Sequence, residues 1–310
     1  MALQTSGSMS YVLDESITSI ALDTFFDETM LWPSLYSQRT SSARREGSAT
    51  VGSLGKFTPK TPGANADEDV LVQEFQKYFV HQAFGKTVPI DRELYDDARD
   101  GKSFDFIQQY GSQLGMSAAY TMEDYAAAVL RDAFAGVTYK AADGLSLCNA
   151  AHVNADGGNS QSNTGTSAFT LDAVNTTRIA MRKFKNSRGL LQSVRPNLLI
   201  GPPELEQSMW EVVRSTGKPN TANRADNFWN GMFGLYIWDF LSTGVDGGDV
   251  NNWFMADSRL MAQSLLWYWR VGLEVYGDGN LFSGTRRVGA YYRASHGVVD
   301  WRFIFGHAVT

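Results

Sequence analysis

The chain has 310 residues, of which 43% are hydrophobic and 19% charged, and this composition excludes a largely disordered protein. Its formal net charge of −6 argues against a protein that wraps nucleic acid by neutralising phosphates. One cysteine cannot form an intrachain disulfide, and we find neither a signal peptide nor an apolar run long enough to cross a membrane. We therefore expect a soluble protein made in a cytoplasm.

Residues 1–45 alternate polar stretches with short apolar clusters, which include Phe25 and Trp32. These clusters are too small to build a core of their own and too apolar to be left in water. Two interpretations stay open. The segment either packs on its own domain or forms an arm that lies across a neighbouring subunit.

Residues 46–88 read as a long two-stranded hairpin. A turn-rich tip, Pro59–Asp69, precedes a predicted strand over Val70–Val80. The side chains expected on one face of that strand are Leu71, Gln73, Phe75, Lys77 and Phe79. An isolated hairpin is marginally stable in water, so we expect another chain to cover this one.

The clearest helix is predicted from about residue 103 to 136. Ser103 is a plausible N-cap, apolar residues then recur at steps of three and four, and the pattern ends at Gly136. Such a helix is much longer than the average of about three turns. A long helix with a single apolar stripe typically packs across a sheet.

The middle of the chain predicts a compact α/β subdomain. After a loop-like region, a second helix is expected from Thr170 to about Lys185. A buried strand, Asn197–Ile200, then leads into Gly201–Pro203, whose prolines favour the start of a third helix that runs to about Ser215.

The last part of the chain predicts strands rich in aromatic residues. Trp267–Val275 alternates with the period of a half-buried strand. Two further strands are expected at Arg286–Arg293 and Val298–Phe305, joined by a turn at Ala294–Gly297 that contains His296.

The sequence offers no credible catalytic, cofactor or metal site. Cys148 and His152 are spaced for metal binding only on a helix, which the surrounding Asn and Gly residues disfavour. The phosphate-binding loop, the dinucleotide fingerprint and the nucleophile elbow are all incomplete. Paired acids near Glu93 read as a solvated face at the entry of a helix. We therefore predict that the protein is not an enzyme.

The order of these parts resembles the major capsid protein of tailed phages with the HK97-type fold, and within that group the Mu-type major head subunit. The most specific local resemblance is a glycine with alternating apolar residues, then Arg92, Glu93, Leu94 and further acids, within Phe84–Asp97. The stretch Asn163–Gly201 also looks similar to the family.

The resemblance implies an α+β fold with named regions. They are an N-arm at 1–45, an extended E-loop hairpin at 46–88, a P-domain at 89–190 and 266–310 with the spine helix at about 103–136, and an A-domain at 191–265. The A-domain would lie at the centre of pentamers and hexamers.

The implied function is that of a capsid protein that self-assembles into an icosahedral shell enclosing double-stranded DNA, without sequence readout. The expected location is the virion capsid, after assembly in the host cytoplasm, with no contact to a membrane. Separate scaffolding, portal and decoration proteins are possible partners. Some relatives carry a cleavable N-terminal scaffolding region, whereas here Met1 leads almost directly into the arm, so a separate scaffold and an earlier processing step both stay open. We predict no covalent crosslink, because neither Lys56 nor Lys60 has an assignable partner.

The residues that we expect at contacts between subunits are Phe25, Trp32, Lys56, Phe57, Lys60, Phe75, Arg92 and Glu93. Two other functions stay open: the shell of an encapsulin-like nanocompartment, and a monomeric carbohydrate-binding protein that uses the tryptophan-rich second half.

Overall fold

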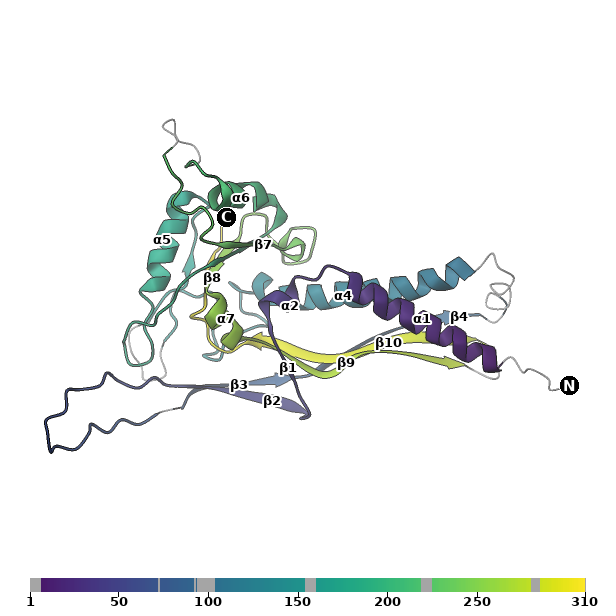
Figure 1. Ribbon diagram of the computed structural model, residues 1–310, viewed down its shortest axis with the longest axis horizontal. Helices are drawn as coiled ribbons and strands as arrows, with labels where there is room; N and C mark the ends of the chain where they lie inside the picture. Colours follow the sequence, from purple (N-terminus) through teal and green to yellow (C-terminus); the bar gives the residue numbers. More distant parts are fainter. Residues whose placement is uncertain are drawn as a thin grey trace.

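The computed structural model describes residues 7–71, 73–91, 93, 104–153, 160–218, 225–279 and 285–309, with the backbone alone for 7–16 and 104–108. The molecule is elongated. A four-stranded sheet and two long helices form one part, a smaller α/β unit forms the second, and a hairpin with an extended tip projects from the junction (Figure 1).

The four-stranded sheet has the order β1 (Ser37–Thr40), β9 (Leu265–Gly279), β10 (Arg286–Val298) and β4 (Gln82–Ile90), with only β1 and β9 parallel. From Trp269 to Tyr276 half-buried and exposed side chains alternate, which confirms the predicted half-buried strand. Leu265 to Tyr268 are buried at every position instead, because this end of the sheet is covered on both faces.

The predicted turn at Ala294–Gly297 is wrong, because β10 runs through it and these residues pair with β9. His296 is buried among the rings of Tyr125, Tyr139 and Trp267, and its Nε2 donates to the Tyr125 carbonyl. Burial in this aromatic cluster holds the residue in the strand. The final strand, β11 (Ile304–His307), belongs to the other sheet, so the strand expected at Val298–Phe305 is also misplaced.

Two long helices, α1 (Gly7–Asp27) and α4 (Phe104–Arg131), lie together on one face of this sheet (Figure 1). They approach closely where α4 carries Gly111 and Gly115, since a Cβ added at Gly115 would lie 2.3 Å from the Ala21 carbonyl oxygen. After α1 comes the short helix α2 (Trp32–Leu35). The N-terminal segment thus packs on its own chain, the first of the two interpretations.

Helix α4 ends at Arg131, five residues before the predicted end at Gly136. The carboxylate of Asp132 accepts hydrogen bonds from the N–H groups of the next turn, at Val137, Thr138 and Tyr139. This local bonding competes with continued helix. The predicted N-cap, Ser103, lies outside the described residues.

The second unit is built on a five-stranded sheet of order β5-β11-β8-β6-β7. Its remaining elements are β5 (Thr164–Gly165), α5 (Leu171–Arg182), β6 (Leu198–Gly201), η1 (Pro203–Leu205), α6 (Glu206–Arg214), β7 (Gly234–Ile237), η2 (Asp239–Leu241), β8 (Trp253–Ala256) and α7 (Ser258–Ser264). The predicted α/β order of this region is confirmed. Thr170 caps α5 through its hydroxyl, which accepts from the Ala173 N–H at 3.1 Å.

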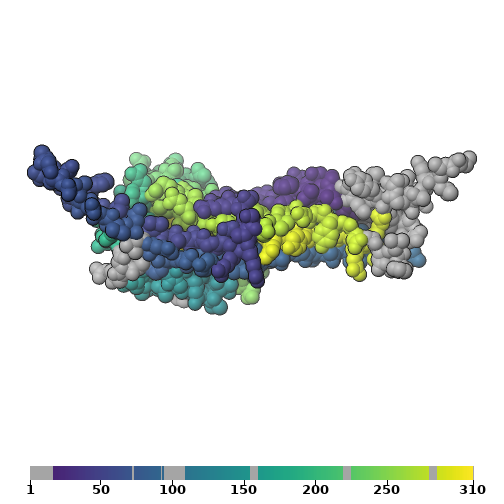
Figure 2. Space-filling view, turned by 90° about the horizontal axis from the view of Figure 1, so that it is seen from below, coloured from purple at the N-terminus to yellow at the C-terminus, as the bar shows by residue number. Residues whose placement is uncertain are grey.

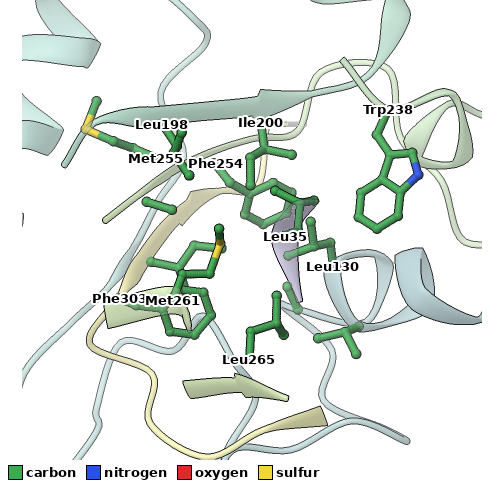
Figure 3. Packing of buried hydrophobic residues seen from close by; sticks show 14 of the residues in the cluster. Leu35, Leu130, Leu198, Ile200, Trp238, Phe254, Met255, Met261, Leu265 and Phe303 are labelled. Carbon is green, nitrogen blue, oxygen red and sulfur yellow. The ribbon is translucent and has the colours of Figure 1, made fainter. Parts of the chain in front are cut away.

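One hydrophobic core joins the two parts. Figure 3 shows Leu35 of α2 and Leu130 of α4 beside Ile200 of β6 and Trp238, within a cluster that also includes Phe254. Contact across this core fixes the second unit against the helices of the first. Of the helices in the described ranges, none is both long and apolar enough to cross a membrane.

The hairpin consists of β2 (Arg45–Val51) and β3 (Gln73–Val80), paired antiparallel from Arg45 with Val80 to Val51 with Gln73. His81 alone separates β3 from β4, so the hairpin is continuous with the main sheet. Between the two strands the chain runs through residues 52–71, which we call the tip segment.

Candidate assembly interface

The tip segment is the most exposed part of the described chain, and Figure 2 shows it standing clear of the body. Phe57 is 101% exposed, and Leu54, Val70 and Leu71 also face solvent. Burial of apolar surface is favourable by about 25 cal/mol per Å², and these side chains lack that stabilisation while they stay in water. Apolar side chains exposed together are typical of a contact with another protein chain, so the tip segment is the candidate interface.

At its root the hairpin is held firmly to the body. Phe79 is buried against Leu266, Tyr268 and Val299, on the sheet face opposite the helices. Lys77 lies beside it, and its ammonium donates to the Lys140 carbonyl. Burial lowers the pKa of Lys77 to about 8, although the nearby Asp143 carboxylate opposes this shift.

His81 sits at the point where β3 becomes β4 and bridges two serines. Its Nε2 lies 3.0 Å from Ser41 Oγ, and its Nδ1 lies 2.9 Å from Ser295 Oγ. Burial and the positive charge of Arg293 lower the pKa of this imidazole. The acid of the group, Glu46, accepts from Ser41 rather than from the histidine. The arrangement therefore lacks the acid–imidazole contact of a catalytic triad and fixes the hairpin root.

A polar cavity of about 230 Å³ separates the hairpin from the body beyond this root. Glu74 of β3 enters it, with its carboxylate 4.0 Å from the guanidinium of the buried Arg302, which also contacts Asp300 at 3.1 Å. Charged groups facing a polar cavity can keep water between hairpin and body.

The N-terminal segment is joined to both parts of the molecule by one carboxylate. Glu123 of α4 accepts from the backbone N–H groups of Leu31 and Trp32, the latter at 3.1 Å, and from the indole Nε1 of Trp238 at 2.6 Å. Burial raises the pKa of Glu123.

Two of the expected contact residues are buried within their own chain. Phe25 and Trp32 are both buried in the main core, and the Trp32 ring stacks on Trp267 with 4.2 Å between ring centroids. Their apolar surface is already covered by the chain's own helices and sheet, so they are not available to another subunit in this conformation.

The other expected contact residues lie along the hairpin and beyond it. Lys56, Phe57 and Lys60 are exposed in the tip segment, Phe75 is half-buried on β3, and Glu93 is exposed. Arg92 lies outside the described residues. The structure thus brings three of them together in one segment and leaves Glu93 apart.

The two residues spaced for a metal site, Cys148 and His152, are both buried. His152 contacts Asp143 and stacks on Trp301, while Cys148, whose thiol pKa is raised by burial, packs against Gly306. In the part of the chain that the structure describes, no three His, Cys, Asp or Glu side chains come together as a metal site.

The residues that fix the hairpin to the body were not predicted from the sequence. They are Glu74, His81 and Arg302, together with Arg188, whose guanidinium lies 2.7 Å from the Asp69 carboxylate. The alternation in Val70–Val80 placed Lys77 and Phe79 on one face, which was a usable signal. The partners of that face lie up to 220 positions away in the sequence, from Phe79 to Val299, and no local pattern identifies them.

Comparison with known proteins gives the family. A family model described as phage capsid protein matches residues 74–306. The chain belongs to the phage capsid protein family.

Solved capsid structures share the fold of this capsid protein at low sequence identity. A chain of the mature capsid of bacteriophage PhiM1 is 11% identical, with a TM-score of 0.60 over 91% of this chain and 88% of that one. A chain of the capsid of cyanophage P-SCSP1u is 15% identical, with a TM-score of 0.56 over 91% and 89%. A virus-like particle from Pyrococcus furiosus is 9% identical, with a TM-score of 0.52 over 95% and 98%. No curated protein sequence matches.

The capsid protein therefore has the predicted α+β, HK97-type fold, and its role is structural, as a subunit of an icosahedral phage shell and not as an enzyme. The phage family disfavours the nanocompartment alternative. The carbohydrate-binding alternative loses its basis, because most of the tryptophans that suggested it are buried. These are Trp229, Trp238, Trp253, Trp267 and Trp301.

Proposed function

We propose that this capsid protein forms pentamers and hexamers whose shell encloses double-stranded DNA, held without sequence readout. The observation that carries the proposal is the tip segment, which extends from the body with Phe57, Val70 and Leu71 in water. A monomer gains nothing by exposing these side chains, whereas a shell supplies a neighbouring copy to cover them. The net charge of −6 agrees with DNA that is confined by the shell rather than bound through its phosphates.

We assign the regions as the resemblance implies: residues 1–45 as N-arm, 46–88 as E-loop, 89–190 and 266–310 as P-domain, and 191–265 as A-domain. Two features support the assignment. The hairpin projects from the body, and α4 lies across the sheet of the second P-domain segment. In the second unit, β6, α6, β7 and β8 fall within 191–265, whereas β5, α5 and β11 come from the P-domain ranges. We place the protein among the Mu-type head subunits on the similarity of Phe84–Asp97 and Asn163–Gly201.

The contact residues that we propose are Lys56, Phe57, Lys60, Phe75 and Glu93, together with Arg92. The exposure of the tip residues supports their part of this set. A separate scaffold, a portal and decoration proteins complete the proposed partners, and assembly takes place in the host cytoplasm.

Deletion of residues 56–68 tests the proposal. The variant should unfold at the temperature of the wild type, because the deleted residues are exposed, yet it should fail to form particles in negative-stain micrographs. Wild-type protein that stays monomeric at every concentration, or a deletion variant that assembles as well as the wild type, would refute the role of the tip segment. Loss of the folded monomer on deletion would show instead that the segment serves folding.

A further inference from the structure

The tip segment leaves the hairpin at residues 52–55 and returns at 69–71, and we call these two stretches its neck. The neck is held by side chains rather than by a strand ladder. The last ladder pair described for the hairpin joins Val51 to Gln73, and further along the Asp69 carboxylate accepts from the Gly55 N–H at 2.7 Å. The Ser53 N–H donates to the hydroxyl of Ser187, a residue of the body, at 2.9 Å.

Arg188 of the body reaches both sides of this neck. Its Nη2 donates to Asp69 Oδ1 at 2.7 Å and to the Val70 carbonyl at 3.1 Å, and its Nε donates to the Ser53 carbonyl at 3.3 Å. The planar guanidinium presents these donors in fixed directions, which a lysine ammonium cannot reproduce. One side chain therefore ties both the outgoing and the returning stretch of the neck to the body.

The turn that carries Arg188 is itself well defined. Asn186 Oδ1 accepts from the N–H groups of Arg188 and Leu190, at 3.1 and 2.9 Å, and Gly189 adopts a φ of +72° that favours glycine. Behind the turn, the side-chain amide of Gln161 bonds both backbone groups of Lys185. Arg188 thus extends from a turn that hydrogen bonds hold in place.

The contacts of Arg188 affect the direction of the tip segment more than the stability of the folded subunit. The side chains of Arg188 and Asp69 are 36% and 37% exposed, and an ion pair so open to water adds little to the free energy of unfolding. Three directed hydrogen bonds nevertheless restrict the orientation of a segment that makes few other contacts with the body. Loss of Arg188 should therefore leave the fold intact and free the tip segment to point in many directions.

We infer that Arg188 is a positioning residue for shell assembly, which fixes the direction in which the tip segment meets the neighbouring copy. This inference rests on the proposed function of the tip segment. The partner is a second copy of this chain, and the side chains presented to it are Phe57 and its exposed neighbours.

The test compares Arg188→Ala with Arg182→Ala, a matched control that removes an exposed arginine from nearby α5. Spin labels at Thr61→Cys and Val137→Cys, two exposed positions, report the distance between tip and body in unassembled subunits, since the natural Cys148 is buried. We expect a narrow distance distribution in the wild type and the control and a broad one in Arg188→Ala. Assembly followed by light scattering should slow at least tenfold, with equal thermal unfolding temperatures.

Asp69→Asn and Arg188→Lys serve as second variants if Arg188→Ala folds poorly. Both should broaden the distribution, and Arg188→Lys should keep part of the assembly rate because it retains the charge. Assembly and distance distributions equal to those of Arg182→Ala would overturn the inference. If Arg188→Ala assembles normally while deletion of 56–68 blocks assembly, the inference alone fails. If the deletion variant also assembles normally, the role of the tip segment fails with it. The proposed shell fails only if the wild type does not assemble.

Discussion

Replacement of Glu123 should reveal how strongly a single carboxylate holds the N-terminal segment and the second unit to α4. Glu123→Ala leaves three donors without their acceptor: the N–H groups of Leu31 and Trp32 and the indole N–H of Trp238. Each buried donor without a partner costs about 1–3 kcal/mol. Burial of the carboxylate, which also raises its pKa, offsets part of this sum. We expect a net loss of about 3 kcal/mol in the free energy of unfolding.

Glu123→Gln separates the individual contacts. Its side-chain oxygen can still accept from Leu31 and Trp32, while its amide NH₂ meets the donor of Trp238. The expected loss is about 2 kcal/mol, and Trp238→Phe in the Glu123→Gln background should cost less than Trp238→Phe in the wild type. Urea unfolding of unassembled subunits compares these four variants with the wild type. A loss below 0.5 kcal/mol for Glu123→Ala, or additive losses in the double variant, would refute this account.

Three further predictions use the same unassembled subunits. Gly115→Ala places a Cβ 2.3 Å from the Ala21 carbonyl oxygen and should lower the free energy of unfolding by about 2–3 kcal/mol, because it forces α1 away from α4. Gly111→Ala, whose Cβ would lie 3.1 Å from the Ile17 carbonyl oxygen, is the milder comparison. Equal effects of the two substitutions would argue against the close approach. Phe57→Ser should leave the unfolding temperature unchanged, because the ring is fully exposed, and slow assembly in light scattering; normal assembly would contradict its contact role. Burial lowers the pKa of His307 to about 4, so the folded state binds fewer protons than the unfolded one between about pH 4 and 6.5, and stability falls as the solution is acidified through that range. His307→Asn should reduce this pH slope by up to about 1.4 kcal/mol per pH unit, and an unchanged slope would exclude His307 as its source.

Local patterns predicted the elements whose burial is periodic. The three- and four-residue spacing gave α4, and alternation gave β3 and the outer half of β9, because one buried face imposes its period on the sequence. The patterns failed where both faces of a strand are buried. Ala294–Gly297 looks like a turn by composition, yet it is a strand because His296 fills an aromatic cluster from α4 and β9.

A related reason explains why Phe25 and Trp32 were expected at subunit contacts although the chain covers them itself. Phe25 and Trp32 are as apolar as Phe57, and sequence alone does not say which apolar side chains the chain covers by itself. Gly111 and Gly115 let α1 approach α4 closely, so the N-terminal helix packs on its own chain. The sequence alone does not reveal this role of the two glycines, because a close approach between helices far apart in sequence leaves no periodic trace.

The same reasoning explains why the hairpin could be predicted while its direction could not. The apolar and turn residues of 46–88 specify a hairpin by local chemistry. Its direction depends on Arg188, which meets Asp69 across 119 positions of sequence through an exposed contact. Such a contact adds little to the stability of the monomer, so burial and hydrophobicity give no sign of it. In a protein whose function is to meet copies of itself, a weak directed contact can determine assembly, because it sets where an exposed surface points rather than whether the chain folds.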